Sequence, residues 1–411
     1  MNTERASSAS LRWTKGDEEM RKKMAVFIAV VLVLDVFALG VIFFTRNSSN
    51  LNINSNAVPG SDPVTTEQQE LFSRVSFVAV GDNLIHNPIY KQAQARTANG
   101  YDFAYAYEKF AEKIAEPDVA ILNQETIISQ EHNVSSYPMF NSPVELGEEM
   151  LDLGFDVFNI ATNHSVDCGE KGLISAMNFW KSKNAITCGA YLNQEDYSNI
   201  PMHEVNGVKI AYIGFTESTN GLSLPEDTEV ILVKASEETR LQQRIADAKE
   251  VADLVVVSAH WGNEYTHEPT ESQRSLAQKL ASWGADVIIG THPHVIQPVE
   301  YITNPDGSKT LVAYSLGNFI SAQDRGPRML GGVLNFEIVI NNATREASFE
   351  NVKFSGVVTH YGYSYSNLRI YPLGDYTEEL ASKHGVLDKT SDFSVKYLYD
   401  IMNKVIDKQF L

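Results

Sequence analysis

The chain has 411 residues, and 43% of them are hydrophobic, so a large core can form. Its 52 acidic residues outnumber its 33 basic residues, which gives a formal net charge of −19. That balance argues against nucleic acid as a partner, because such binding depends on positive charge that neutralises phosphates. It also argues against broad electrostatic capture of a polyanion, so an anionic substrate would have to be held by a metal ion or by a local cluster.

A candidate membrane anchor lies near the N-terminus. Met24–Thr45 is an apolar stretch of 22 residues interrupted only by Asp35, and ~20 apolar residues are enough to span a bilayer. Six basic residues precede this stretch, whereas Arg46 is the only basic residue between it and Arg74. Because positive charge stays on the cytoplasmic side, we expect residues 1–23 to be a cytoplasmic tail and the main domain to be extracellular.

A cleaved signal peptide is the alternative to a single-pass anchor retained in the cell membrane. The apolar stretch is longer than the ~7–15 residues of a usual signal peptide. The small-residue triplet Ala38-Leu39-Gly40 is followed by further apolar residues instead of a polar mature start. We therefore favour an anchor at residues 24–45, in which Asp35 is costly unless it faces a partner helix. Beyond residue 46 the chain has 26 basic and 47 acidic residues, a formal charge of −21.

Three segments are expected to follow the anchor. Residues 46–73 are predicted to form a flexible stalk, because residues 47–69 are rich in Asn, Ser and Thr and contain two prolines. The main domain is expected at residues 74–325, and residues 326–411 are expected to complete it with strands and a helix.

From residue 74 onward strands and helices alternate, which predicts an α/β fold. Short apolar runs predict buried strands of a parallel sheet at residues 77–80, 119–122, 157–160, 208–215, 254–257 and 287–289, with another strand at residue 186. Helical periodicity is present at residues 143–150, 170–183, 236–249, 270–283 and 392–410. Two antiparallel hairpins are predicted after residue 296, one at 299–302 with 310–314 and one at 331–340 with 347–357.

Seven polar residues follow closely where these apolar runs stop. They are Asp82, Glu125, Asn163, His164, His260, His292 and His294. In open α/β sheets, ligands gather beyond the carboxyl ends of the strands. Two carboxylates, one carboxamide and four imidazoles at one edge are a set of groups suited to divalent transition metals.

The segment His292-Pro293-His294 is the strongest local signal. Residues two apart in an extended segment point the same way, so both imidazoles can meet one metal centre. The intervening proline fixes one φ and disfavours helix. Taken alone, such a pair is more often two exposed loop histidines. A single histidine such as His260 is likewise more often structural. A role in metal binding is supported only when these histidines are considered together with the other groups.

The remaining candidates have distinct chemical roles. Asp82 offers a hard carboxylate ligand, and Glu125 has two oxygens that can bridge two cations ~3.5–4 Å apart. The amide oxygen of Asn163 is a weak ligand, while His164 can act as a general acid that Asp167 orients. Read singly, each of these residues is also compatible with an ordinary turn or helix cap.

Only two cysteines are present, Cys168 and Cys188. Outside the cell they can pair. Cys168 is expected to precede a helix and Cys188 to lie on the following strand, so contact is feasible. The sequence leaves this disulfide open, because it does not give the Cβ geometry.

Together these residues resemble the CapA family, proteins of bacterial poly-γ-glutamate capsule synthesis, which in turn resembles the calcineurin-like metallophosphoesterase superfamily. The matching segments are Gly81-Asp82, Asn123-Gln124-Glu125, Thr162-Asn163-His164 with Asp167 and Gly169, His260–Tyr265, Gly290–Gln297 and Ser315–Phe319. They cover about residues 75–320 in the family's order. The resemblance implies a four-layer α/β/β/α sandwich with two metal ions (Mn, Fe or Zn) at one sheet edge.

The resemblance also implies roles for individual residues. It places Asp82 and His294 on one metal, Asn163, His260 and His292 on the other, Glu125 between them and His164 beside the substrate. The substrate-binding residues would be His86, Trp261, Glu264, Tyr265 and Asn318. Two departures from the superfamily pattern are the spacing from Asp82 to His86 and the glutamate at the bridging position.

Three functions are compatible with these features. In the first, a cation-activated water attacks a phosphoester, or an amide, of the capsule polymer or of an unrelated substrate, and His164 protonates the leaving group. In the second, the chain is a non-catalytic scaffold or partner of capsule synthase or export membrane proteins, which the anchor and Asp35 favour. The third, a soluble cytoplasmic phosphatase, is disfavoured by the anchor. We expect capsule synthesis or export at the bacterial cell surface, with an anionic polymer or a phosphoester as the bound partner.

Overall fold

The computed structural model describes residues 71–411. The predicted cytoplasmic tail, the predicted anchor and nearly all of the predicted stalk lie outside the described residues. Within residues 71–411, none of the helices combines the length and the apolar character that crossing a bilayer requires.

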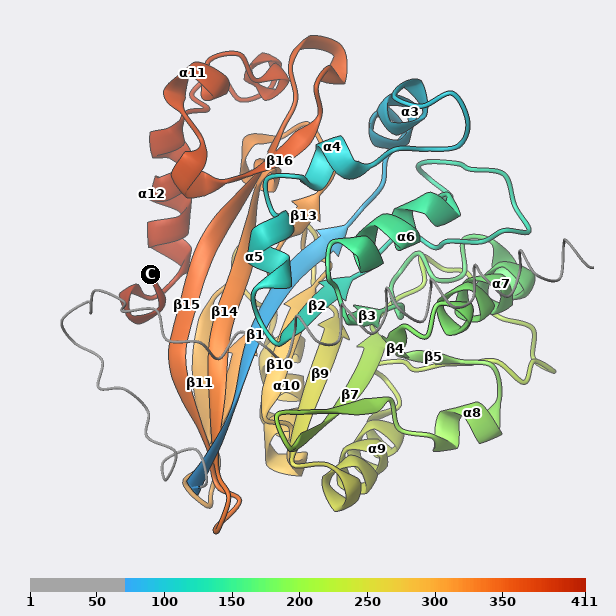
Figure 1. The fold of residues 1–411 in the computed structure, drawn as a ribbon, viewed down its shortest axis with the longest axis vertical. Helices are drawn as coiled ribbons and strands as arrows, with labels where there is room; N and C mark the ends of the chain where they lie inside the picture. Colours follow the sequence, from blue (N-terminus) through green and yellow to red (C-terminus); the bar gives the residue numbers. More distant parts are fainter. Residues whose placement is uncertain (1–70) are drawn as a thin grey trace, which may run out of the picture. The chain divides into compact units, whose positions relative to one another are not determined.

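Two mixed β-sheets form the centre of the fold (Figure 1). In spatial order, the first sheet contains β16 (Arg369–Pro372), β15 (Ala347–His360), β14 (Leu330–Asn341), β1 (Phe72–Asn83), β2 (Val119–Asn123), β3 (Val157–Asn159) and β4 (Ile186–Cys188), and β13 (Asn318–Ile320) pairs with β1. The second contains β11 (Val299–Thr303), β12 (Lys309–Ala313), β10 (Val287–Thr291), β9 (Leu254–His260), β7 (Val208–Thr216) and β6 (Met202–Val205). A small sheet pairs β5 (Ala190–Tyr191) with β8 (Ile231–Leu232).

The apolar runs alone suggested one parallel sheet, whereas the four-layer sandwich implied by the family resemblance has two sheets, as the structure does. Strands β1, β2 and β3 run parallel in the first sheet, whereas β7, β9 and β10 run parallel in the second. A buried strand looks the same in sequence whichever sheet it joins, so the division was not readable from the apolar runs.

Side-chain alternation along β9 shows how the layers stack. Val255 and Val257 belong to the core shared with the helices α9 (Glu238–Val251) and α10 (Glu271–Trp283), while Val256 belongs to the core between the sheets. On the outer face of the first sheet, Trp180 of α7 (Gly169–Ser182) stacks on Phe158 of β3 with ring centroids 4.3 Å apart. Together with α6 (Val144–Asp152), these helices give a mixed α/β architecture of helix, sheet, sheet and helix.

The predicted helices and hairpins are present, with small shifts at their ends. Helix α10 begins where Thr270 and Gln273 form a capping box, which satisfies its first free backbone N–H groups. The hairpin β11–β12 pairs Val299 with Ala313, and β14–β15 pairs Val339 with Ser348. The predicted C-terminal helix is shorter than its apolar pattern and forms α12 (Val395–Val405).

Several short elements carried too weak a pattern to be predicted. The helices are α3 (Asn87–Ala95), α4 (Ala104–Tyr107), α5 (Ala111–Ala115), α8 (Gln194–Ser198) and α11 (Glu378–Ala381). The 3₁₀ segments are η1 (Gly326–Met329), η2 (Tyr363–Tyr365), η3 (Leu373–Asp375), η4 (Gly385–Asp388) and η5 (Lys408–Phe410).

The carboxyl ends of the parallel strands meet where the two sheets face each other. In the first sheet Asp82 pairs in register with Asn123, and Asn123 with Asn159. In the second, Thr291 pairs with His260. Gly81 makes this junction possible, because a Cβ at that position would lie 1.8 Å from the carbonyl oxygen of Gly317.

Candidate metal centre

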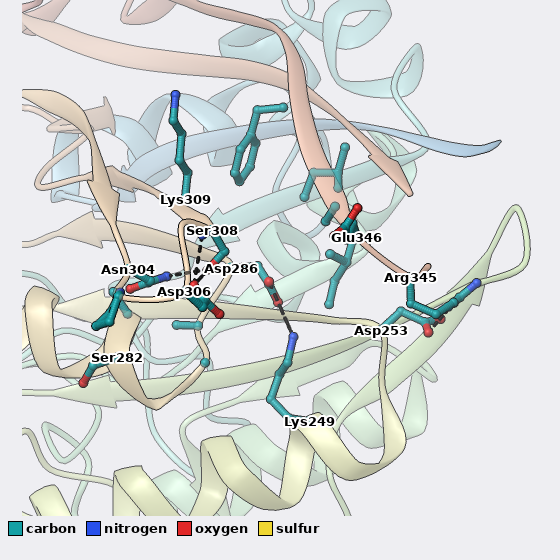
Figure 2. Close-up of a pocket in the computed structure, with 18 residues that line it drawn as sticks. Lys249, Asp253, Ser282, Asp286, Asn304, Asp306, Ser308, Lys309, Arg345 and Glu346 are labelled. Atoms are coloured by element: carbon teal, nitrogen blue, oxygen red, sulfur yellow. Dashed lines mark hydrogen bonds and ion pairs between the residues drawn. The ribbon is translucent and has the colours of Figure 1, made fainter. Parts of the chain in front are cut away.

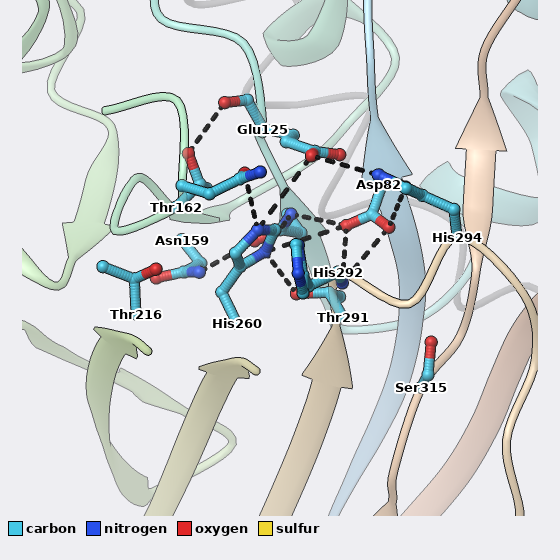
Figure 3. Close-up of polar contacts among 12 residues, drawn as sticks. Asp82, Glu125, Asn159, Thr162, Thr216, His260, Thr291, His292, His294 and Ser315 are labelled. Carbon is cyan, nitrogen blue, oxygen red and sulfur yellow. Dashed lines mark hydrogen bonds and ion pairs between the residues drawn. The ribbon is translucent and has the colours of Figure 1, made fainter. Parts of the chain in front are cut away.

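Asp82 lies at the end of β1 and is completely buried. One of its carboxylate oxygens accepts a hydrogen bond from the amide of Asn123 at 2.8 Å, and the backbone N–H of His292 approaches at 3.2 Å. The carboxylate is thus held between the two sheets, where Figure 3 shows it pointing toward the histidines.

Glu125 lies just beyond β2 and faces the same point (Figure 3). Its side chain is 0% exposed, yet neither carboxylate oxygen has a hydrogen-bond partner. The oxygen Oε1 is 3.6 Å from His294 Nε2 and 4.0 Å from His260 Nε2. Burial raises the pKa of this carboxyl well above its usual value, and Asp82 adds to the effect. A buried carboxylate without donors is the environment that a cation would complete.

Three histidines surround this carboxylate. His260 Nε2 is 2.9 Å from the amide oxygen of Asn163, and its Nδ1 is 3.1 Å from the hydroxyl of Thr291. Ligand atoms of Glu125, His292 and His294 all lie within 4.8 Å of one another. The site therefore brings together donors that are far apart in the chain.

The backbone around Pro293 is not extended, which corrects the expectation for this segment. Strand β10 ends at Thr291, and both histidines have left-handed backbone angles, φ = +95° at His292 and +58° at His294. Such conformations are uncommon for residues with a side chain and concentrate at functional sites. The two imidazoles converge because the chain bends, and their ring centroids are 5.8 Å apart.

The electrostatics of the imidazoles differ. Burial, with a smaller contribution from His294, lowers the pKa of His292 to about 4. Burial also acts to lower the pKa of His294, but the carboxylates of Glu125 and Asp82 outweigh it and raise that pKa to about 9. Burial and the neighbouring histidines lower the pKa of His260 well below its ordinary value.

These residues fit a divalent metal site. Carboxylate oxygens, an amide oxygen and imidazole nitrogens are the donors that such ions take. Besides the Glu125 oxygens, Nδ1 of His292 is buried without a hydrogen-bond partner. Water-excluded ligand atoms left without partners on two separate segments, Glu125 and His292, are explained better by a cation than by packing.

His164 and Asp167 form a pair beside the cluster. His164 Nδ1 is 2.7 Å from Asp167 Oδ2, and that oxygen also accepts a hydrogen bond from the backbone N–H of Phe140 at 2.6 Å. The ring of Phe140 meets the ring of His164 edge-on at 4.7 Å. The imidazole is therefore fixed in orientation, with Nε2 left for other contacts.

Comparison with known proteins adds a family to this geometry. The family described as "Bacterial capsule synthesis protein PGA_cap" matches residues 76–323 of the chain. The chain belongs to this family. That stretch includes all six predicted metal ligands and the His164–Asp167 pair.

Two curated relatives of this family member carry the name CapA. The chain is 38% identical over 176 residues to "PGA biosynthesis protein CapA" of Bacillus subtilis, covering 42% of this chain and 44% of that protein. It is 35% identical over 183 residues to "Capsule biosynthesis protein CapA" of Bacillus anthracis, covering 44% and 43%. The matched stretches thus span less than half the length of these relatives.

Solved structures with similarity to this PGA_cap member include phosphoesterases. The calcineurin-like phosphoesterase YfkN of Bacillus subtilis is 15% identical with a TM-score of 0.42, covering 80% of this chain and 99% of that one. The NAD nucleotidase NadN of Haemophilus influenzae is 14% identical with a TM-score of 0.42, covering 82% and 60%.

Three of the residues expected to bind substrate in this family member, Glu264, Tyr265 and His86, lie beside the cluster. Glu264 and Tyr265 face the cluster from solvent: Glu264 Oε1 is 3.9 Å from His294 Nε2, and the Tyr265 ring is 43% exposed. His86 is held beside the site, where its Nδ1 accepts a hydrogen bond from the backbone of Ala322 and burial lowers its pKa to about 4.

Two residues predicted to bind substrate, Trp261 and Asn318, are buried. Trp261 is 1% exposed, donates its indole N–H to the carbonyl of Tyr314 and packs in the core under α9 and α10, so substrate has no access to it. Asn318 is buried, with its amide oxygen 3.1 Å from His294 Nδ1. It orients a predicted metal ligand rather than lining a pocket.

Three further residues contribute to the centre and were not singled out from sequence. Asn123 donates to Asp82, Asn159 donates to Asn123 at 2.8 Å, and Thr291 contacts His260. All three lie at strand ends in register with predicted ligands, so the strand-end pattern already contained the signal.

The two cysteines are free. As predicted, Cys168 directly precedes α7 and Cys188 lies on β4. Their sulfur atoms approach different backbone carbonyls, those of Phe140 and Phe158. The disulfide that the sequence left open is not formed.

A hollow of about 480 Å³ lies at the other end of the strands (Figure 2). Charged residues line it, and four of them form ion pairs: Lys249 contacts Asp286 at 3.2 Å, and Arg345 contacts Asp253. None of the predicted metal ligands lines this hollow.

Proposed function

We propose that this capsule synthesis family member is a metal-dependent hydrolase acting in the synthesis or export of the capsule polymer. The bond that it hydrolyses is a phosphoester or an amide. The observation that carries the proposal is the buried carboxylate of Glu125, without hydrogen-bond donors, among His260, His292 and His294.

Two divalent cations, Mn, Fe or Zn, would be held at this site. Asp82 and His294 would bind one ion, Asn163, His260 and His292 the other, and Glu125 would bridge them. When bound, the ions supply Lewis-acid activation of water and stabilise charge that develops on the reacting oxygens. Only a neutral imidazole nitrogen can ligate, so His260 and His292 are in the form that binds a metal, whereas His294, whose pKa is raised to about 9, would release its proton when the ion binds.

His164 is proposed to donate the proton that the leaving group requires. Its Nδ1 is occupied by Asp167 at 2.7 Å, so Nε2 is the nitrogen available to substrate. The carboxylate fixes the tautomer and the orientation of the imidazole. Asp167 is a positioning residue in this scheme.

Hydrolysis of bis(4-nitrophenyl) phosphate by the purified full-length protein tests the proposal. We expect turnover with Mn²⁺, Fe²⁺ or Zn²⁺, loss of turnover with chelator, and loss in the variant His294→Ala. The matched control His132→Ala removes an exposed histidine outside the cluster and should leave turnover unchanged. Wild-type turnover that chelator does not affect would exclude the metal mechanism.

Residues 24–45 favour action at the outer face of the cell membrane and a second candidate role. Asp35, an acidic residue within an otherwise apolar stretch, motivates docking on a membrane protein of a capsule synthase or export complex. In that role the metal centre would position polymer without cleaving it. Photo-crosslinking from position 35 in cells should recover a membrane partner, and recovery of the chain alone would count against this role.

A further inference from the structure

Arg328 lies close to the metal centre but outside the stretch matched by the family, residues 76–323. It belongs to the 3₁₀ segment η1. Its guanidinium carbon is 3.4 Å from the centroid of the Tyr265 ring. That ring in turn is 6.0 Å from the ring of His294. One aromatic ring therefore separates the guanidinium from a proposed metal ligand.

Both partners of this stack are fixed to the segment that carries His294. The backbone N–H of Tyr265 donates to the carbonyl of Pro293 at 2.8 Å. The amide of Asn318 donates to the carbonyl of Arg328 at 3.1 Å, and its amide oxygen is 3.1 Å from His294 Nδ1. The position of the guanidinium relative to the metal centre is thus determined by short contacts.

The charge of Arg328 is not neutralised within the described residues. Neither a carboxylate within ion-pair distance nor a hydrogen-bond acceptor for its guanidinium is found in residues 71–411. By contrast, Arg74 pairs with Glu350 at 2.6 Å, and the nearby Arg325 contacts Asp324 at 3.9 Å. Within the same residues Arg96, which stacks on Tyr105 at 4.2 Å, also has no such partner, so what distinguishes Arg328 is its position beside the metal centre.

Stacking leaves the binding edge of the guanidinium free. A cation–π contact uses the flat face of the group, while its N–H donors lie in the plane and can engage a planar anion bidentately. The single positive charge and planar donors of one guanidinium match the single charge and planar oxygens of a carboxylate better than the two charges of a phosphate monoester. The geometry therefore favours a carboxylate.

We infer that Arg328, supported by Tyr265, binds a substrate carboxylate while the scissile group lies at the metal centre. This inference rests on the proposed function and narrows its substrate class to phosphoesters or amides that carry a carboxylate near the bond attacked. Arg328 determines specificity and does not touch the reacting atoms.

Binding of inert phosphonates tests the inference without turnover. The probes are ω-carboxyalkylphosphonates with two to five methylene groups, each compared with the alkylphosphonate of equal length, titrated calorimetrically into the Mn²⁺-loaded full-length protein. At the length that spans the two positions, the carboxylate should tighten binding about tenfold or more. The Arg328→Gln variant should lose that gain and keep the affinity for the plain alkylphosphonate.

The control variant is Arg325→Gln, which removes an exposed arginine three residues away and should keep the full carboxylate gain. Unchanged thermal unfolding of Arg328→Gln shows that the fold is intact. If the carboxylate gives no gain while alkylphosphonates bind in a metal-dependent way, the Arg328 inference fails alone. If no phosphonate binds with Mn²⁺, the proposed function fails. If alkylene bisphosphonates gain more from Arg328 than the carboxylates do, the assignment to a carboxylate is wrong.

Discussion

Glu125, at the carboxyl ends of the central strands, differs from the aspartates at the starts of these strands. Four aspartates directly precede β2, β3, β9 and β10, and each accepts a hydrogen bond from a backbone N–H of the neighbouring strand at 2.7–2.9 Å. They are Asp118, Asp156, Asp253 and Asp286, bonded to Ser76, Ala120, Lys209 and Val255. At the carboxyl ends of the same strands, Glu125 is buried and has no donor at all.

The presence or absence of a hydrogen-bond donor thus distinguishes the structural aspartates from Glu125. A donor supplied by the backbone stabilises the charged form, so the aspartates at strand starts need no further ligand. A buried carboxylate without donors destabilises the protein unless a cation binds. Asp82 has hydrogen-bond donors and is still a proposed ligand, so the missing partner singles out Glu125 in particular.

The largest expected effect comes from Glu125. Replacing it with glutamine removes the proposed bridge, and turnover of bis(4-nitrophenyl) phosphate should fall more than about 100-fold. The carboxylate has no hydrogen-bond donor to lose, although it lies 3.6 Å from His294 Nε2, so the metal-free variant should unfold at close to the temperature of the metal-free wild type. Strong destabilisation of the metal-free variant would show that Glu125 is a structural carboxylate like those at the strand starts.

A smaller loss of activity is expected at Asp167. The variant Asp167→Asn keeps the shape but removes the charge that orients His164, so kcat should fall roughly 10–100-fold. Metal content should stay at the wild-type value. A KM effect with unchanged kcat would contradict the positioning role.

A buried histidine outside the centre extends the comparison to imidazoles. His384 Nε2 donates to the carbonyl of Thr359 at 2.9 Å, and its Nδ1 accepts from the backbone N–H of Val386 at 2.9 Å. Burial lowers its pKa to about 3. Since the unfolded chain binds the proton more readily, stability should fall as pH drops from about 6.5 toward 3, by roughly 2 kcal/mol for this group between pH 7 and 5.

Urea unfolding of the full-length protein at pH 7 and pH 5 measures this effect. The variant His384→Gln should be less stable at pH 7 and should lose less between the two pH values than the wild type. An equal loss in both proteins would show that other groups carry the pH dependence.

The smallest effect is expected at the strand starts. Asp253 accepts from the backbone of Lys209 at 2.9 Å and pairs with Arg345. These contacts outweigh the effect of burial and lower its pKa. The variant Asp253→Ala should lose roughly 1–2 kcal/mol of stability, with unchanged turnover and metal content. Lost turnover in a folded protein would connect the two ends of the strands in a way that their contacts do not explain.

Much of the centre was predictable because its signal is local. Each of Asp82, His260 and His292 follows an apolar run closely, and strand ends gather at one edge whichever sheet they belong to. The same local pattern also predicts that Trp261 is buried. In β9, Val255 and Val257 face the helices, so Trp261 shares their side while His260 faces the other sheet.

Other features had no local signal. The positive φ angles of His292 and His294 depend on the packing of the bend, not on the residues themselves. The stack of Arg328 on Tyr265 joins residues that are distant in sequence. Whether a carboxylate finds a donor is likewise settled only when the strands are paired. For that reason the difference between Glu125 and Asp253 was not predictable.

Metal stoichiometry tests the central claim most directly. The purified full-length protein, stripped with chelator and titrated with Mn²⁺, should bind two ions per chain, as measured by calorimetry and elemental analysis. The Glu125→Gln variant should lose tight binding, while Asp253→Ala should keep both ions. A wild-type protein that binds no ion, or a Glu125→Gln variant that binds as the wild type does, would contradict the account.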